Sequence, residues 1–148
     1  MKKFLKFALA ALLLSTVTAA YSYEKEFNPN NLPKNIKSFI ATNFPDEKIV
    51  EATTEHNDIN GALEEYEVKF SSDVKIDFDA KGEWTEIDCF GTLVPLPRAV
   101  IPADILQYVE LNYPGLAIEE IKREKGRYEV LLSDRRELKF DSNFNLVK

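Results

Sequence analysis

A pattern that occurs twice along the chain constrains the fold more than any other feature of the sequence. Asn43-Phe44-Pro45 returns as Asn112-Tyr113-Pro114, 69 positions later. The further repeated pairs are Leu32-Pro33 and Ile101-Pro102, Tyr66-Glu67-Val68 and Tyr128-Glu129-Val130, and Phe78-Asp79 and Phe140-Asp141, and in the last two pairs the offset has fallen to 62. Repeats of this kind decide the architecture of a chain. The pattern predicts two copies of one unit, of which the second is 7 residues shorter.

Each copy is predicted to begin with an amphipathic helix, over 33–43 and 103–112. The apolar residues at helical spacing are Ile36, Phe39 and Ile40 in the first copy and Ile105, Tyr108 and Val109 in the second. Proline suits the first turn of a helix, where its missing N–H needs no acceptor. Pro45 and Pro114 are expected to end the helices, because the residue before a proline avoids the helical conformation.

Alternating apolar and polar residues after each helix predict strands. The predicted strands cover 48–55, 63–70, 74–79 and 83–89 in the first copy and 117–124, 127–132, 136–140 and 145–147 in the second. Spacing in 48–55 is irregular, which favours a β-bulge. Short turns imply antiparallel meanders, and a helix laid across the apolar face of a sheet buries both. We therefore expect an α+β fold of two tandem helix-plus-four-stranded repeats, with the helices on one face of one eight-stranded sheet or of two abutting sheets.

The first twenty residues have the pattern of a cleaved secretory signal. Three lysines precede the apolar run 7–14, and small residues follow it up to Ala20. The run is too short to span a bilayer, and no cysteine stands near the cleavage site to carry a lipid. We expect a periplasmic or secreted protein, with a flexible leader over 21–31 and a single domain over 32–148. That domain divides into repeat 1 (32–89), a linker (90–100) stiffened by two prolines, and repeat 2 (101–148).

The charge of the mature chain limits its partners. Loss of Lys2, Lys3 and Lys6 with the signal leaves 16 basic residues (19 minus 3) against 25 acidic ones, a net charge of −9 (16 minus 25). Such a chain is repelled by nucleic acid and by anionic lipid. We expect no nucleic-acid binding and no membrane insertion after cleavage. The charge suits an envelope protein, or a partner with a basic surface.

The order and spacing of these motifs resemble the PepSY-like, β-lactamase-inhibitor-like family of exported proteins, best known from Bacteroidetes. The resemblance covers 32–88 and 101–147, and the linker also looks like the joint between repeats in that family. It implies a tandem helix-plus-four-strand fold and a largely unassigned molecular function. It supplies no catalytic residue, and inhibitory activity carried over from the fold would be analogy alone.

Few residues point to catalysis or metal binding. His56 is the only histidine and lies in a predicted connection, where we interpret it as an exposed loop residue and not a positioned base. Cys89 is the only cysteine, which excludes an internal disulfide. We favour a buried apolar role for it, with a reactive or intermolecular thiol as the alternative. The run 77–88 begins like a calcium loop, but Lys81 stands where a ligand belongs and a hairpin turn explains the same residues. We predict no enzyme activity, no cofactor and no metal site.

The polar residues of the predicted strands are expected to share the sheet face that looks toward water. Those proposed to bind a partner are Glu65, Glu67, Lys69, Lys75, Asp77, Arg127, Glu129, Glu137 and Lys139. A broad sheet face offers the area that a stable protein interface needs. The sequence thus predicts an exported, non-enzymatic module that binds an unknown exported or envelope protein as an inhibitor or chaperone. The alternative is a periplasmic small-ligand or cation-binding protein, using acidic loops such as Asp58 or 73–79.

Overall fold

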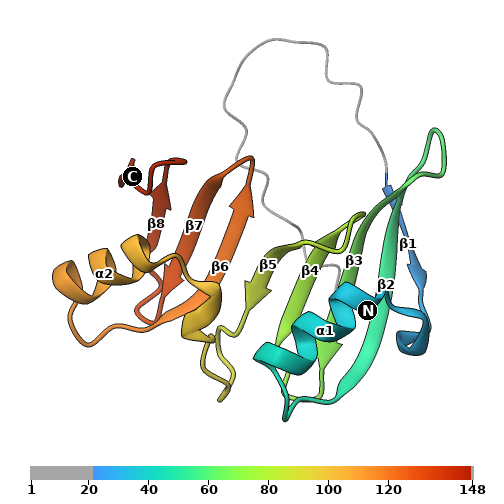
Figure 1. Ribbon diagram of the computed structural model, residues 1–148, viewed down its shortest axis with the longest axis horizontal. Helices are drawn as coiled ribbons and strands as arrows, with labels where there is room; N and C mark the ends of the chain where they lie inside the picture. Colours follow the sequence, from blue (N-terminus) through green and yellow to red (C-terminus); the bar gives the residue numbers. More distant parts are fainter. Residues whose placement is uncertain (1–21, 148) are drawn as a thin grey trace.

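The protein folds as α+β, with eight antiparallel strands in one open sheet (Figure 1). The computed structural model describes residues 22–147. The strands are β1 (Ser22–Glu26), β2 (Ile49–Asn57), β3 (Leu63–Phe70), β4 (Lys75–Asp79), β5 (Trp84–Asp88), β6 (Ile118–Glu124), β7 (Arg127–Leu132) and β8 (Glu137–Phe140). The α-helices are α1 (Lys34–Asn43) and α2 (Ala103–Asn112), and the short 3₁₀ helices are η1 (Pro29–Asn31) and η2 (Arg98–Val100). The spatial order of the strands is their order in the sequence. Among the described helices, none has the length and apolar composition to cross a membrane.

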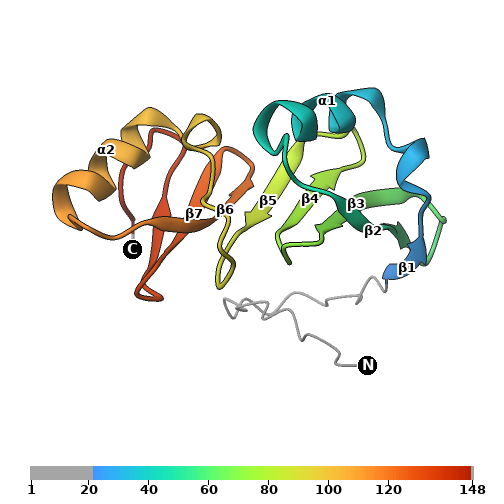
Figure 2. The same cartoon turned by 90° about the horizontal axis from the view of Figure 1, so that it is seen from below.

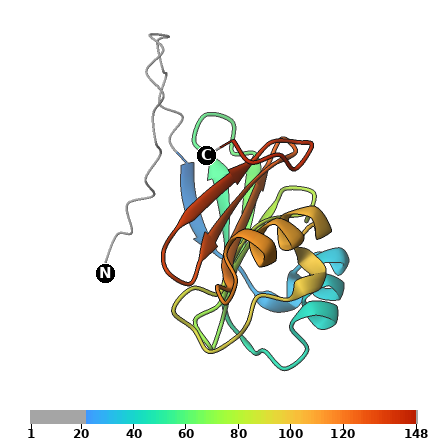
Figure 3. The ribbon, with the colours of Figure 1, turned by 90° about the vertical axis from the view of Figure 1, so that its left-hand side faces the viewer.

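Both α-helices lie on the same side of the sheet (Figures 2 and 3). The strand residues on that side form the core, as Val68 and Phe70 in β3 show by their complete burial. Side chains alternate between the faces of a strand, so Glu67 and Lys69 lie on the other side. We call this other side the open face. An antiparallel sheet that packs on one face and is open on the other shows this alternation of apolar and polar residues.

The two helices end in the same way, which explains why Asn-aromatic-Pro occurs twice. The Asn43 side-chain amide donates to the Phe39 carbonyl at 3.0 Å, and the Asn112 amide donates to the Tyr108 carbonyl at 2.9 Å. In both helices the aromatic residue that follows the asparagine closes the last turn with a backbone hydrogen bond of 2.8 Å. In each helix the asparagine side chain thus bonds the carbonyl four residues before it, and the N–H of the following aromatic residue bonds the next carbonyl along the chain.

The same aromatic contact joins each helix to the sheet. Phe39 in α1 meets Phe78 in β4 edge to face, with ring centroids 5.7 Å apart, and Tyr108 in α2 meets Phe140 in β8 edge to face at 5.5 Å. Phe78 is fully buried and Phe140 is 1% exposed. Such pairs add about 0.5–1.5 kcal/mol beyond the burial of their area. Phe78 and Phe140 thus belong to the core, and Phe39 and Tyr108 pack against it.

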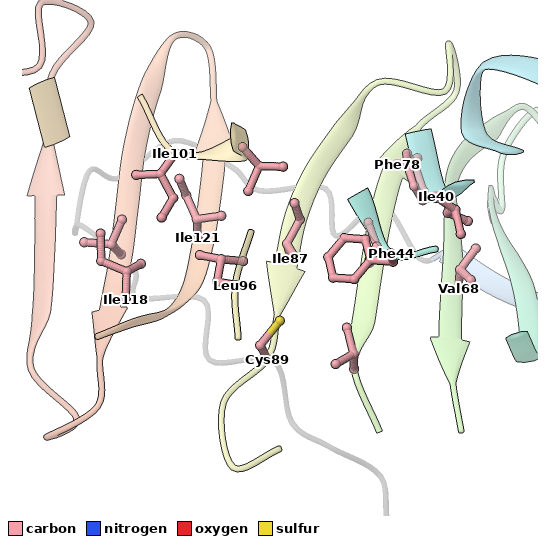
Figure 4. Close-up of a cluster of buried hydrophobic side chains, with 14 of the residues drawn as sticks. Ile40, Phe44, Val68, Phe78, Ile87, Cys89, Leu96, Ile101, Ile118 and Ile121 are labelled. Atoms are coloured by element: carbon pink, nitrogen blue, oxygen red, sulfur yellow. The ribbon is translucent and has the colours of Figure 1, made fainter. Parts of the chain in front are cut away.

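The two halves of the sheet meet at β5 and β6, where three residue pairs are in register. Ile87 and Ile121 lie opposite each other there, and both are fully buried. From the linker, Leu96 packs into the same core, together with Ile101 at its end (Figure 4). Cys89 directly follows β5 and is 2% exposed, so its predicted burial near the joint is confirmed. One hydrophobic core runs beneath both helices.

The structure corrects three expectations. The leader was expected to be flexible, but its residues Ser22–Glu26 form β1, paired in register with Thr53–Asn57 of β2. The predicted strand over 145–147 is reduced to a single bridge between Phe140 and Leu146. His56 lies in β2 and not in a loop. The expected bulge in β2 is present, between Ile49 and Glu51. The predicted signal, 1–20, lies outside the described residues.

Candidate binding surface

The nine residues proposed from the sequence all lie on the open face. Residues 65, 67 and 69 of β3 stand opposite residues 79, 77 and 75 of β4. In the other half, Glu129 in β7 stands opposite Lys139 in β8, and Arg127 and Glu137 share the open face with them. The register continues a row of polar side chains through Asp77, Glu86, Lys122 and Glu129. The sheet therefore brings the nine residues together on one surface that spans both halves.

The exposure of these residues is uneven. Arg127 and Glu137 are exposed, and most of the others are half-buried. Asp77 is only 8% exposed, so the expectation that it faces water is wrong. The open face is thus a surface of partly covered charges, with the carboxylate of Asp77 the most enclosed of the nine.

Lys122 connects two carboxylates across the joint between the halves. Its ammonium lies 3.2 Å from Glu86 in β5 and 3.0 Å from Glu120 in β6. Burial by itself would lower the pKa of Lys122, but the two carboxylates outweigh it and raise that pKa above its usual value. Burial raises the pKa of Glu120, and Lys122 partly offsets this. These three residues were not proposed from the sequence, although their alternation with Ile87 and Ile121 carried the signal.

A second lysine binds two carboxylates in the last two strands. The Lys139 ammonium lies 2.9 Å from Glu129 and 3.0 Å from Glu137. Its hydrogen bonds, first to Glu129 and then to Glu137, raise the pKa of Lys139. Four carboxylates on β5–β8 therefore each form an ion pair with a lysine of the same chain: Glu86, Glu120, Glu129 and Glu137.

The half of the open face that β1–β3 form has a different charge pattern. Glu24 in β1 lies directly opposite Glu55 in β2, and Glu55 lies directly opposite Glu65 in β3. Glu26 and Glu67 lie on either side of Thr53. Like charges placed directly opposite each other in a sheet destabilise it. Glu51 of β2 lies on the same face, opposite Lys69. The sequence did not lead us to propose Glu24, Glu26, Glu51 or Glu55, because β1 was not predicted and the register of β2 was unknown.

His56 and Cys89 have structural surroundings. His56 Nδ1 donates to the Gly61 carbonyl at 3.1 Å, Nε2 lies 3.0 Å from the Thr54 hydroxyl, and the ring stacks on Tyr23 of β1 at 5.5 Å. Burial, and then the carboxylate of Asp88, raises the pKa of the Cys89 thiol to about 12. A neutral thiol is a poor nucleophile. Neither residue is arranged for catalysis.

A cavity of about 420 Å³ lies between α2, the linker and β6. Its wall includes Cys89, Leu96 and Val109, and it includes Arg98 and Glu110, which form an ion pair of 2.7 Å. Among residues 22–147, no group of three or more His, Cys, Asp or Glu side chains is placed to hold a metal ion. We therefore take the open face, with its row of charged side chains, as the candidate binding surface.

Comparison with known proteins identifies relatives of this chain. The sequence profile of one family, described as "Putative beta-lactamase-inhibitor-like, PepSY-like", matches residues 19–61 and 64–148. None of the curated proteins matches the chain.

Solved structures of similar proteins come from Bacteroides. A protein of Bacteroides thetaiotaomicron, described as "a putative calcium-regulated periplasmic protein", is 41% identical, with a TM-score of 0.77 over 84% of this chain and 94% of that one. A protein of Bacteroides vulgatus, described as "a putative periplasmic protein", is 39% identical, with a TM-score of 0.76 over 84% and 94%. A second protein of that organism, described as of unknown function, is 29% identical, with a TM-score of 0.75 over 86% and 98%.

Proposed function

Because this chain belongs to the PepSY-like, β-lactamase-inhibitor-like family, and membership in it supplies no catalytic residue, we propose that the chain is a non-enzymatic module. In this proposal it binds another exported protein through its open face. The observation that carries the proposal is the row of charged side chains across the sheet, on the face that neither α-helix covers. A face of this breadth can supply the roughly 800 Å² per partner that standard protein interfaces bury.

We also propose that the chain is made of two tandem repeats and is exported. The paired helix ends and the paired aromatic contacts support two units of one kind. The three similar proteins are all described as periplasmic, which supports cleavage of residues 1–20 and a periplasmic or secreted location for the mature chain. In this organisation 32–89 and 101–148 are the repeats and 90–100 is the linker, while β1 extends the sheet from the leader.

Affinity capture tests the role of the open face. Envelope proteins are passed over the mature chain, 21–148, and over the variant Glu65→Lys/Glu67→Lys/Glu129→Lys. A control variant, Asp46→Lys/Asp58→Lys/Asp104→Lys, changes the net charge equally at exposed positions off the open face. We expect a stoichiometric protein to be captured by the mature chain and by the control but not by the open-face variant. Equal capture by all three folded proteins would refute the open face as the binding surface.

A cation-binding function is the second candidate. The observation in its favour is the description of the 41% identical B. thetaiotaomicron protein as calcium-regulated. A ligand that binds only the folded state raises the melting temperature, by an amount that follows from its dissociation constant. A rise in Tm with CaCl₂, unmatched by MgCl₂ at equal ionic strength, would support this candidate, and equal Tm values in both salts would eliminate it.

A further inference from the structure

We propose that the cavity between α2, the linker and β6 binds a small amphipathic cation, a molecule with an apolar body and one positively charged head group. The cavity lies on the helix side of the sheet (Figure 2), so this site goes beyond the proposed function and is separate from the open face. Ligand pockets in proteins have volumes of about 300–1,000 Å³. The cavity, at about 420 Å³, is large enough to be one.

The linker that forms one wall of the cavity is longer than the fold requires. β1 and β5 occupy matching places in the two halves, since each pairs with the strand that follows the next α-helix. Residues 27–28 are enough to connect β1 to η1, whereas residues 89–97 connect β5 to η2. The additional residues run along the cavity and contribute much of its wall. Loops held by a rigid scaffold are frequent carriers of binding residues.

Hydrogen bonds and an ion pair hold this wall in place. The Thr92 hydroxyl donates to the Cys89 carbonyl at 2.8 Å, and the Val94 N–H donates to the Thr92 hydroxyl at 3.1 Å. At the other end of the linker, the Arg98 guanidinium donates to the Glu110 carboxylate of α2 at 2.7 Å. The cavity is therefore formed before a ligand arrives, which lowers the entropy that binding costs.

The inner wall is apolar. Leu96, Ile101 and Ile118 all contribute to it, and each keeps 7–8% of its surface exposed. Leu93 belongs to the same wall and is fully exposed. An aliphatic or aromatic body in the cavity would remove these apolar surfaces from water, which is the main source of affinity in such pockets.

The charged residues of the wall favour a cation as the head group. They are Glu110, Glu119 and Arg98, and Arg98 is already paired with Glu110. Glu119 is half-buried and forms no ion pair with any residue from 22 to 147. Burial, and then nearby carboxylates that include Glu119, raise the pKa of Cys89, so a negative potential reaches that part of the wall. A positive head group would balance the remaining charge, whereas a carboxylate would add to it.

An NMR titration of the mature chain with octylamine tests the proposal. At pH 7 octylamine is an aliphatic chain with one positive charge, because alkyl ammonium groups keep their proton there. Octanoate and octanol are the matched ligands, with the same chain and a negative or neutral head group. We expect saturable shifts of the backbone amides in the linker and at the start of β6. The dissociation constant should be about tenfold lower for octylamine than for octanoate, with octanol between them, because only the charge of the head group differs.

Two single-charge variants identify the group that recognises the cation. Glu119→Gln is compared with Glu124→Gln, which makes the same change on the same strand but outside the cavity. We expect Glu119→Gln to weaken octylamine binding about fivefold and to leave octanol binding unchanged, while Glu124→Gln changes neither. A third variant, Ala117→Trp, introduces a large side chain at an exposed position of the wall. It should block all three ligands.

The ligand series on the unmodified chain decides the outcome even if a variant fails to fold. Octanoate binding as tight as octylamine binding, or tighter, would overturn the positive head group. Shifts confined to residues of the open face, or no saturable shift with any of the three ligands, would overturn the cavity as a binding site. An equal loss of octylamine binding in Glu119→Gln and Glu124→Gln would show that net charge alone attracts the amine, which would also overturn the proposal.

Discussion

The open face allows one substitution to be made at two places with opposite expected effects on stability. Glu55 in β2 lies opposite Glu24 and Glu65, whereas Glu129 in β7 lies opposite Lys122 and Lys139. Replacing either glutamate by glutamine removes one negative charge and keeps nearly the same shape. We expect Glu55→Gln to stabilise the protein and Glu129→Gln to destabilise it.

The magnitudes follow from the contacts. A directly opposed pair of like charges costs about 0.2–1 kcal/mol, and Glu55 takes part in two, so Glu55→Gln should raise the free energy of unfolding by about 0.4–2 kcal/mol. The Ser22 hydroxyl donates to the Glu55 carboxylate, and glutamine retains an oxygen to accept that bond. Glu129 loses its 2.9 Å ion pair with Lys139. Partly exposed ion pairs contribute about 0.2–1 kcal/mol, so Glu129→Gln should lower the free energy of unfolding by that amount.

Urea unfolding, followed by the fluorescence of Trp84, the single tryptophan, measures both changes. The two effects should shrink together in about 0.5 M NaCl, because salt screens charges at the surface. A loss of stability in Glu55→Gln equal to that in Glu129→Gln would refute the reasoning, since it would show that the register does not set the electrostatics of this face.

Three other predictions concern the core and the turns. Burial, followed by the charge of Asp88, raises the pKa of Cys89 from an ordinary 9.0 to about 12, so the folded thiol keeps its proton where the unfolded thiol loses it. The stability that this group contributes is complete below pH 9 and falls as the pH rises toward 12; between pH 8 and pH 10 the wild type should lose about 1 kcal/mol more than Cys89→Ala in urea unfolding. Gly82 has φ +79°, and a Cβ there would lie 2.5 Å from the Asn35 side-chain nitrogen, which donates to the Lys81 and Gly82 carbonyls. Gly82→Ala should cost about 1–3 kcal/mol, more than Gly126→Ala, where φ is +77° but the Cβ would meet only Ser142 at 3.5 Å. Phe78→Ala and Phe140→Ala should each lower the free energy of unfolding by about 3–5 kcal/mol in thermal unfolding, because each leaves a cavity beneath the helix aromatic ring that the phenylalanine contacts. A loss confined to one variant would show that the two contacts are not equivalent.

The helices and the central strands could be predicted because their residues follow the periods of their elements. The predicted helix 103–112 coincides with α2, and the predicted strand 63–70 coincides with β3. In both, one side must be buried, so apolar residues recur at a fixed interval. Cys89 was placed correctly for a related reason, since a free thiol beside apolar residues is commonly buried.

The strand β1 could not be predicted because none of its residues is buried. All five, Ser22–Glu26, are exposed, and the strand is held by backbone pairing with β2. The carboxylates Glu24 and Glu26, which belong to this strand, were missed with it. Ion pairs such as those of Lys122 depend on which residues face each other across strands, and a shift of one residue would send every side chain to the opposite face. The sequence identifies the charged residues of the open face, while only the register shows which of them are neutralised.

Cross-linking mass spectrometry of the captured complex tests most directly whether the open face binds the partner. Amine-reactive cross-linkers can reach lysines on both sides of the molecule: Lys69, Lys75 and Lys139 on the open face, and Lys34 and Lys37 on α1. If the open face binds the partner, cross-links to the bound protein form through the open-face lysines. Cross-links confined to Lys34 and Lys37 would place the partner over the helices and contradict it.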